Sequence, residues 1–431
     1  MTPKFRSTAF LLLCICLSVQ CSQAQQGETN KRWSLEECIN SALQNQVDVL
    51  IARNQVIRAQ AQYSKALSNY FPQVRVENIA FTGGSASGVL SQTTTGTAVS
   101  VAQNLFDGGL REASVSAARY GVRSSEAQRK RVEQTIVYNV TRAYFELLRA
   151  KRLAEVARKN VEYNEALFSQ VQAMVEKGEA AAVDLLPVKA QLANARVSLV
   201  AAENQVRTAA IELQNQMGFA PRSDFDVAEP TAPVEFQVQS LDAYISAALQ
   251  IRPDVLQRAA DLQAARAQRT SARISLYPRP YVTAEYQHRV SGGYRESASQ
   301  IIGGFVFDVF NGGANQAAYR EAEIQFRNAQ LEAQQIEKDI RAEVEEAYLN
   351  LTSAKERLVA SEVSLEAATE NYEAQKERYA QGSGTTLDML NAEVQLVTAQ
   401  TGQVQAQYDY YVAIAQLKYA TGTIWGGRNE K

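Results

Sequence analysis

The sequence predicts a mixed α and β fold, mainly α, in which a unit of long coiled-coil helices and two β-strands occurs twice. Three observations lead to this class: a composition that favours long helices, an internal duplication, and a strand-to-helix corner that appears once in each copy. The two corners read "NLFDGG" and "DVFNGG", and their glycines are Gly108, Gly109, Gly312 and Gly313.

Composition and charge narrow the class of protein. The chain has 431 residues, with 44 Lys and Arg against 46 Asp and Glu, for a net charge of −2. A nucleic-acid-binding protein would show a clustered basic excess, so we expect no nucleic-acid partner. The single histidine, His288, and the few cysteines argue against a His/Cys metal site, and no GxxxxGK or GxGxxG motif follows a predicted strand. We therefore expect no cofactor and no metal, and we place His288 in or near a strand.

The first 24 residues have the pattern of a secretory signal peptide: a basic start, an apolar run, and small residues before Gln25. Cys21 leaves open a lipoprotein anchor, although Gln20 is a poor residue to precede an acylated cysteine. Removal of the signal would leave Cys38 alone, so no internal disulfide is expected. No run of about 18 apolar residues follows, so the sequence predicts no transmembrane helix.

The rest of the chain is a duplication. Ser34–Pro72 aligns without a gap to Ser240–Pro278, with about a third of the positions identical. Further matches follow in the same order, among them "VTRAYFEL" with "VEEAYLNL" and "KGEAAAVDLL" with "QGSGTTLDML". We expect a first repeat over residues 25–218, a linker over 219–239, a second repeat over 240–422 and a tail over 423–431.

Each repeat is predicted to begin with a helix and two strands. Ser34 and Ser240 suit the N-cap position, and the helix that follows should run to about Tyr70 or Tyr277, before a proline. The strands lie within 73–106 in the first repeat and 279–310 in the second, joined by loops rich in Gly and Ser.

After each glycine corner the helical pattern continues for about 65 residues, or roughly 100 Å at the helical rise. It stops at a tip near Gly178 or Gly382, from which a last helix returns to Gly218 or Gly422. Steps of four and three along these helices predict coiled-coil seams. The seams consist of Ile136, Val140, Ala143, Leu147, Ala150, Ala154, Ala157 and Val161, and of Leu387, Leu390, Val394, Val397, Thr401, Val404, Tyr408 and Tyr411.

The strands alternate between apolar and polar residues over about ten positions and are edged by Tyr and Phe, which is typical of membrane β-strands. One face is predicted to carry Val99, Val101, Gln103 and Leu105, and in the second repeat Ile301, Gly303, Phe305, Phe307 and Val309. Four strands cannot close a barrel, and an open sheet edge cannot lie in lipid. Several copies must therefore pool their strands, and this argument allows a dimer, a trimer or a tetramer equally.

The signal peptide, the duplication, the glycine corners and the two tip motifs together resemble the TolC family of outer-membrane efflux proteins, over Ser34 to Gly422. The resemblance implies a homotrimer with a 12-stranded membrane β-barrel, continued by an α-helical barrel in the periplasm of a Gram-negative bacterium. It also implies a passive, non-enzymatic exit duct in the outer-membrane lipid. The duct would dock to a periplasmic adaptor (membrane fusion protein) and an inner-membrane transporter.

The resemblance also predicts the site residues. Family members like the founding protein carry a tyrosine three residues before the second tip glycine, an arginine two after it, and aspartates six and nine after it. Tyr379 and Asp388 match this pattern, whereas Gly384 replaces the arginine and Asn391 the second aspartate. Asp184 matches a family aspartate at the first tip. These five residues form the predicted pore constriction, and the predicted adaptor-docking tips are Gly178, Ala180, Ala181, Gly382 and Thr385.

Other interpretations remain open at this stage. Asp184 and Asp388 also suit helix N-termini, where capping would explain them without any role in a pore. An outer channel for type I protein secretion would have the same fold. A periplasmic coiled-coil adaptor anchored at Cys21 is a different class, and the two strand pairs argue against it.

Overall fold

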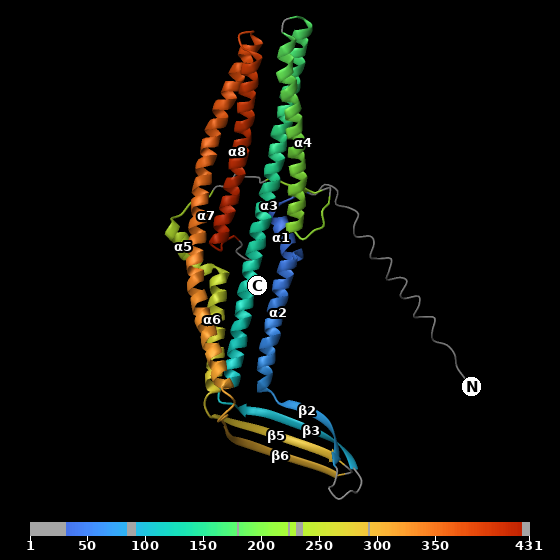
Figure 1. Cartoon of the computed structure of the whole chain (residues 1–431), viewed down its shortest axis with the longest axis vertical. Coiled ribbons are helices and arrows are strands. Elements are labelled where there is room, and N and C mark those ends of the chain that lie inside the picture. Colours follow the sequence, from blue (N-terminus) through green and yellow to red (C-terminus); the bar gives the residue numbers. More distant parts are fainter. Residues whose placement is uncertain are drawn as a thin grey trace, which may run out of the picture.

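The computed structural model describes residues 32–83, 92–178, 181–222, 225–229, 236–291 and 294–424. The chain forms a long bundle of helices with a β-sheet across one end, and helical hairpins reach the opposite end (Figure 1). The mixed, mainly α fold class is confirmed. Among the described residues, no helix has an apolar stretch of the length that a membrane crossing requires.

The same order of elements occurs twice. The first set is α1 (Leu35–Asn45), α2 (Val47–Leu67), η1 (Ser68–Tyr70), β2 (Gln73–Gly83), β3 (Gln92–Phe106), α3 (Leu110–Glu176), η2 (Ala182–Asp184) and α4 (Leu185–Gln216). The second is α5 (Leu241–Ile251), α6 (Pro253–Ile274), β5 (Arg279–Ser291), β6 (Tyr294–Val306), α7 (Ala314–Ala380) and α8 (Thr386–Ala420). Two short strands that the sequence did not predict, β1 (Arg32–Trp33) and β4 (Asp226–Val227), pair in parallel.

The first helix of each repeat is interrupted, so the prediction of one continuous helix is wrong. Gln46 is extended at φ −68° and ψ 129°, and its side chain accepts a hydrogen bond of 2.7 Å from the Val47 amide. Arg252 is extended at φ −62° and ψ 131° because Pro253 follows it and disfavours the helical conformation. Proline is tolerated at the first position of a helix, so the chain bends at Arg252 and a new helix begins at Pro253.

Arg252 ties this bend to the end of α8. Its side chain is 2% exposed, and its Nη1 donates to the backbone oxygen of Ala420 at 2.8 Å. The same guanidinium forms ion pairs with Asp254 at 2.5 Å and Glu343 at 2.7 Å. Arg131 of α3 lies within 3.6 Å of Asp254 and 3.5 Å of Glu343. Four charged side chains from α3, α6, α7 and the α5–α6 bend therefore meet at the C-terminal end of α8.

The predicted seam of α3 is buried except at Ala157, which is half-buried. The predicted seam of α8 is wrong near the tip, where Leu387 is 64% exposed and Val394 is also exposed. Leu390 of the predicted seam is buried as expected, and Met389 and Leu396, which lie outside that seam, are buried as well. The reason is that α8 packs against both α7 and α3, so its buried surface is wider than one heptad stripe.

The sheet contains four antiparallel strands in the order β2-β3-β5-β6, so the β3–β5 pair joins the two repeats. The strand prediction to residue 310 is too long. Strand β6 ends at Val306 opposite Arg279, the first residue of β5, and Phe307 and Val309 lie beyond it. Strands β2 and β6 form the two edges, and within the described chain neither has a partner on its outer side.

The two faces of the sheet differ in polarity. Because alternate residues of a strand point to opposite faces, the pairing register assigns each side chain to a face. One face carries Val74, Val76, Val101, Tyr286, Ile301 and Phe305. The other carries Arg75, Glu77, Glu285, Gln287, Arg289 and Gln300. His288 lies on β5, where its Nδ1 is 2.8 Å from the hydroxyl of Ser297 on β6.

Candidate functional site: the sheet corners and the helical tips

The corners between sheet and helix are made by glycine pairs in the left-handed region. Gly108 and Gly109 have φ values of 72° and 94°, and Gly312 and Gly313 have values of 68° and 83°. Residues other than glycine rarely adopt such φ values. At the first corner Asp107 accepts hydrogen bonds from the amides of Gly109 at 3.2 Å and Arg111 at 3.0 Å, which satisfies the exposed start of α3.

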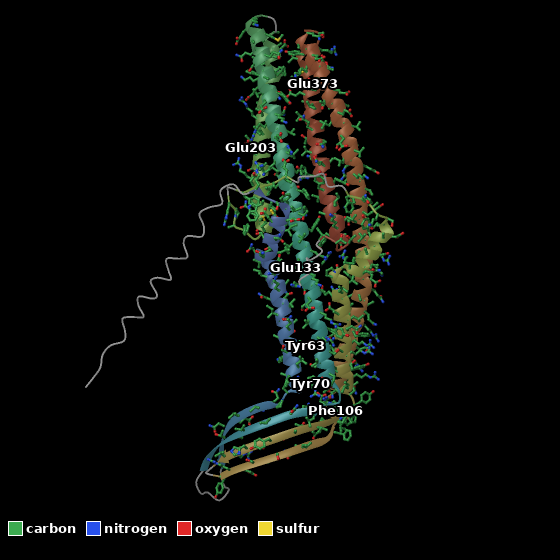
Figure 2. The ribbon with its side chains drawn as sticks, turned by 180° about the vertical axis from the view of Figure 1, so that it is seen from behind. Tyr63, Tyr70, Phe106, Glu133, Glu203 and Glu373 are labelled. Atoms are coloured by element: carbon green, nitrogen blue, oxygen red, sulfur yellow. The ribbon has the colours of Figure 1, made fainter. Side chains whose placement is uncertain are left out.

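Arg111 was not among the predicted site residues, yet it fixes the first corner. Its side chain is 9% exposed, and its Nη1 donates to the backbone oxygen of Asn104 at 2.7 Å. The guanidinium lies 3.9 Å from the ring centroid of Tyr70, which Figure 2 shows at the junction of helices and sheet near Phe106. The second corner uses Asn315, whose amide donates to the backbone oxygen of Ser275 at 3.1 Å. A long cationic side chain two residues after a glycine pair was the available sequence signal.

At the opposite end of the molecule, the α3/α4 and α7/α8 hairpins pack against each other. A cluster of buried apolar residues joins them, consisting of Leu167, Val171, Val188, Tyr372, Met389, Leu390, Ala392 and Leu396. Tyr379 packs at the edge of this cluster, with its hydroxyl 3.8 Å from Met174 Sδ and 3.5 Å from Thr386 Oγ1. Tyr379 therefore contacts the first hairpin rather than projecting freely from the tip.

The second tip ends in a reciprocal cap. The Asp388 amide donates to Thr385 Oγ1 at 3.1 Å, and Asp388 Oδ2 accepts from the Thr385 hydroxyl at 2.7 Å and amide at 3.2 Å. Thr385 is thus the N-cap, and Asp388 occupies the third helical position. The hydrogen bonds from Thr385, followed by the charge of Arg378, hold the pKa of Asp388 below its ordinary value. Asp388 is fully exposed, so the carboxylate that stabilises the turn also presents a negative charge to solvent at neutral pH.

The turn before Asp388 is tight around Gly384, the position of the family's arginine. Gly382 has a φ of 73°, and the Gly384 amide donates to the backbone oxygen of Arg378 at 3.1 Å. A Cβ added at Gly384 would lie 3.1 Å from the backbone nitrogen of Tyr379, closer than ordinary contact allows. Asn391 is exposed one turn after Asp388, on the same side of α8.

The first tip has half of the same arrangement. Gly178 has a φ of 76°, and Asp184 Oδ2 accepts from the Ala181 amide at 3.3 Å. Ala181 has no hydroxyl, so the return bond that Thr385 supplies at the second tip is missing. Asp184 and Ala181 are exposed, and Ala180 lies outside the described residues. Within the described ranges, no group of three or more His, Cys, Asp or Glu side chains is placed to hold a metal ion.

The fold matches known channel proteins. The crystal structure of the outer membrane protein VceC of Vibrio cholerae superimposes with a TM-score of 0.79 at 18% identity, covering 90% of this chain and 96% of that one. The outer membrane efflux protein BepC of Brucella suis is 27% identical over 335 residues, 76% of this chain and 72% of that protein. The alkaline protease secretion protein AprF of Pseudomonas aeruginosa is 26% identical over 301 residues, 68% of this chain and 62% of that protein.

Fold and relatives together define a class: an exit duct of the Gram-negative outer membrane. The family of outer membrane efflux proteins matches residues 38–218 and 244–423, in two blocks that correspond to the two repeats. The chain belongs to this family. The predicted family, function and location are therefore confirmed, and the relatives are channel proteins rather than enzymes.

Proposed function

We propose that three copies of the chain close a 12-stranded barrel in the outer membrane, and that their helices form a continuous periplasmic conduit. The observation that carries this proposal is the sheet, whose β2 and β6 edges are open and whose one face is apolar. Ile301 and Phe305 on that face are 75% and 77% exposed, as expected of side chains that contact lipid. An unpaired backbone edge in hydrocarbon costs several kcal/mol per group, so β6 of one copy must pair with β2 of the next.

The width of the barrel argues against two copies, and membership of the family of outer membrane efflux proteins supports three. Two copies would supply eight strands, and the interior of an eight-stranded barrel is just wide enough for side chains to fill. Three copies give a wider barrel, in which Arg75, Glu77, Glu285 and Arg289 line a polar lumen. A polar, water-filled interior is what an exit duct requires.

The constriction of the duct lies at the tips. Three copies of Asp388 around one axis would attract cations and repel anions, and divalent cations could bridge the carboxylates and block the current. Asn391 leaves the ring single, and Asp184 adds a second charge at the neighbouring tip. Tyr379 packs at the edge of the apolar cluster between the hairpins, and Gly384 offers no side chain for a latch, so the closed state would rely on that cluster.

The tip surfaces suit a docking role. The far end of the helices carries the small, exposed residues Gly178, Ala181, Gly382 and Thr385, against which the hairpin tips of a periplasmic adaptor could pack closely. The adaptor would link the duct to an inner-membrane transporter, which supplies the energy and selects the cargo. A second function, the exit channel for a secreted protein, is supported by the similarity to the alkaline protease secretion protein.

Single-channel recordings on the purified protein in planar bilayers test the constriction. We expect Asp388→Asn to weaken divalent block and lower cation preference, and Asn391→Asp to strengthen both effects. Asp242→Asn is the matched control, since Asp242 also lies in the first turn of a helix but far from the tip. If Asp388→Asn and Asp242→Asn behave alike, Asp388 serves only as a cap. Adding the adaptor and transporter of each candidate system to the purified protein shows whether the duct serves efflux or protein secretion.

A further inference from the structure

One buried carboxyl group links the two hairpins below the tips. Glu393 of α8 is 1% exposed, as is typical of its buried neighbour Ala392 but not of a charged side chain, whereas Val394 after it is exposed. Its Oε1 accepts a hydrogen bond from the side-chain amide of Asn164, which belongs to α3 and is itself fully buried. The contact therefore crosses from the α7/α8 hairpin to the α3/α4 hairpin.

The hydrogen bonds around Asn164 lack one donor. Its amide nitrogen donates to the backbone oxygen of Asn160 at 2.8 Å, to Asn160 Oδ1 at 2.9 Å, and to Glu393. Its own oxygen, Oδ1, is buried and has no hydrogen-bond partner. An ionised carboxylate only accepts hydrogen bonds, whereas a protonated one carries an O–H donor. A protonated Glu393 would therefore carry a donor of the kind that Asn164 Oδ1 lacks, and an ionised Glu393 would not.

Among the residues that the structure describes, no positive charge offsets the burial of Glu393. None of the ion pairs among the described residues includes Glu393. From α7, Tyr372 faces it, and Glu373 and Lys376 beside that tyrosine pair with each other at 3.7 Å. On the α3/α4 hairpin, Glu165 pairs with Arg196 at 2.7 Å, with both side chains about half exposed. A buried charge without a partner is costly, so the site favours the neutral acid.

We propose that Glu393 and Asn164 form a protonation-dependent clasp, which holds the two hairpins together when the carboxyl is neutral and loosens when it ionises. The clasp lies next to the apolar cluster that joins the hairpins near the tips, so loosening it frees the end of the molecule where the constriction lies. Its effect on the duct rests on the proposed function, but the clasp itself does not.

The electrostatics agree with this geometry. Burial raises the pKa of Glu393 to about 7, and the hydrogen bond from Asn164 offsets only part of this effect. Burial, followed by the charge of Glu393, raises the pKa of Tyr372 to about 12, so Tyr372 stays neutral throughout. The packed hairpins therefore bind one proton that the separated hairpins release. Packing is favoured at acidic pH and weakens as the pH rises from about 4.5 to about 7.

Hydrogen exchange on the full-length protein in detergent tests the clasp. Exchange of segments 160–171 and 389–400 is compared between the wild type and Glu393→Gln at pH 5 and pH 8, so that the intrinsic pH dependence of exchange cancels. Glutamine has the shape of the neutral acid and can donate to Asn164 at every pH. From pH 5 to pH 8, we expect the ratio of the wild-type to the variant exchange rate to rise by one to two orders of magnitude. This is about the factor allowed by a pKa of about 7 in place of the ordinary 4.5.

Glu373→Gln is the matched control, because Glu373 is an exposed glutamate in the same part of the molecule (Figure 2). Its exchange ratio to the wild type should not depend on pH. A carboxylic-acid infrared band that is present at pH 5 and absent from Glu393→Gln gives an independent measurement. A pH-independent ratio for Glu393→Gln, or no such band, would overturn the clasp. A clasp without any conductance in bilayers would instead contradict the proposed function alone.

Discussion

Replacing Arg252 by methionine tests whether the bend between α5 and α6 anchors the end of α8. The change keeps most of the side-chain volume but removes two ion pairs and the hydrogen bond to the Ala420 carbonyl. Breaking a buried ion pair by removing one partner costs about 3–5 kcal/mol. Arg131 remains near both carboxylates and Glu343 is 37% exposed, so we expect the lower end, about 3 kcal/mol.

Hydrogen exchange of the last two turns of α8 measures this loss locally. About 3 kcal/mol corresponds to an opening equilibrium roughly a hundredfold larger, so protection of residues 413–420 should fall by that factor. Arg258→Met is the control, because Arg258 forms a 2.8 Å ion pair with Glu332 in which both side chains are at least 40% exposed. Such a surface pair contributes about 0–1 kcal/mol. Equal losses of protection in the two variants would refute the anchoring argument.

Two further predictions concern the backbone and the membrane face. Gly218→Ala should destabilise the protein, because the φ of Gly218 is 77° and a Cβ would lie 2.9 Å from the Asn45 carbonyl. Gly402→Ala, in a helix with open space around it, should stabilise the protein by up to about 1 kcal/mol. The thermal unfolding midpoints of both variants in detergent measure the two effects. Ile301→Arg should reduce recovery in the outer-membrane fraction, while Gln300→Arg on the opposite face should leave it near the wild-type level. Similar recovery of the two arginine variants would mean that the apolar face does not contact lipid.

The duplication made much of the fold predictable from the sequence. Two copies of the same landmarks placed the glycine corners and tips, and the helices between corner and tip contain no proline, so their lengths followed. The break at Arg252 could have been predicted, since Pro253 stands in the sequence and constrains the residue before it. The matching break at Gln46 could not, because glutamine carries no such signal and the break depends on its side-chain cap.

The sites that depend on contacts between hairpins were beyond the reach of sequence patterns. The α8 seam was misplaced because heptad periodicity describes one helix against one partner, and α8 has two. For the same reason Glu393 looks like any surface glutamate in the stretch "LNAEVQ". Its burial becomes apparent only when α3 is placed beside α8. Asp388 shows a different limit: the same carboxylate satisfies a cap and carries an exposed charge, and the sequence alone cannot separate these roles.

Disulfide cross-linking between strand edges tests the central claim, that neighbouring copies complete one barrel through β2 and β6. Cysteine at Val76 in β2 is combined in turn with cysteines at alternate positions along β6, in protein oxidised in the outer membrane. Because paired strands bring Cα atoms within about 5.5 Å, one register should form disulfides. A Val101→Cys and Tyr286→Cys pair, directly opposite on β3 and β5, is the control and should close within one chain. We predict a covalent species of three chains for one β6 position. If only the control pair forms, or if the β2–β6 disulfides stop at two chains, the barrel of three copies is contradicted.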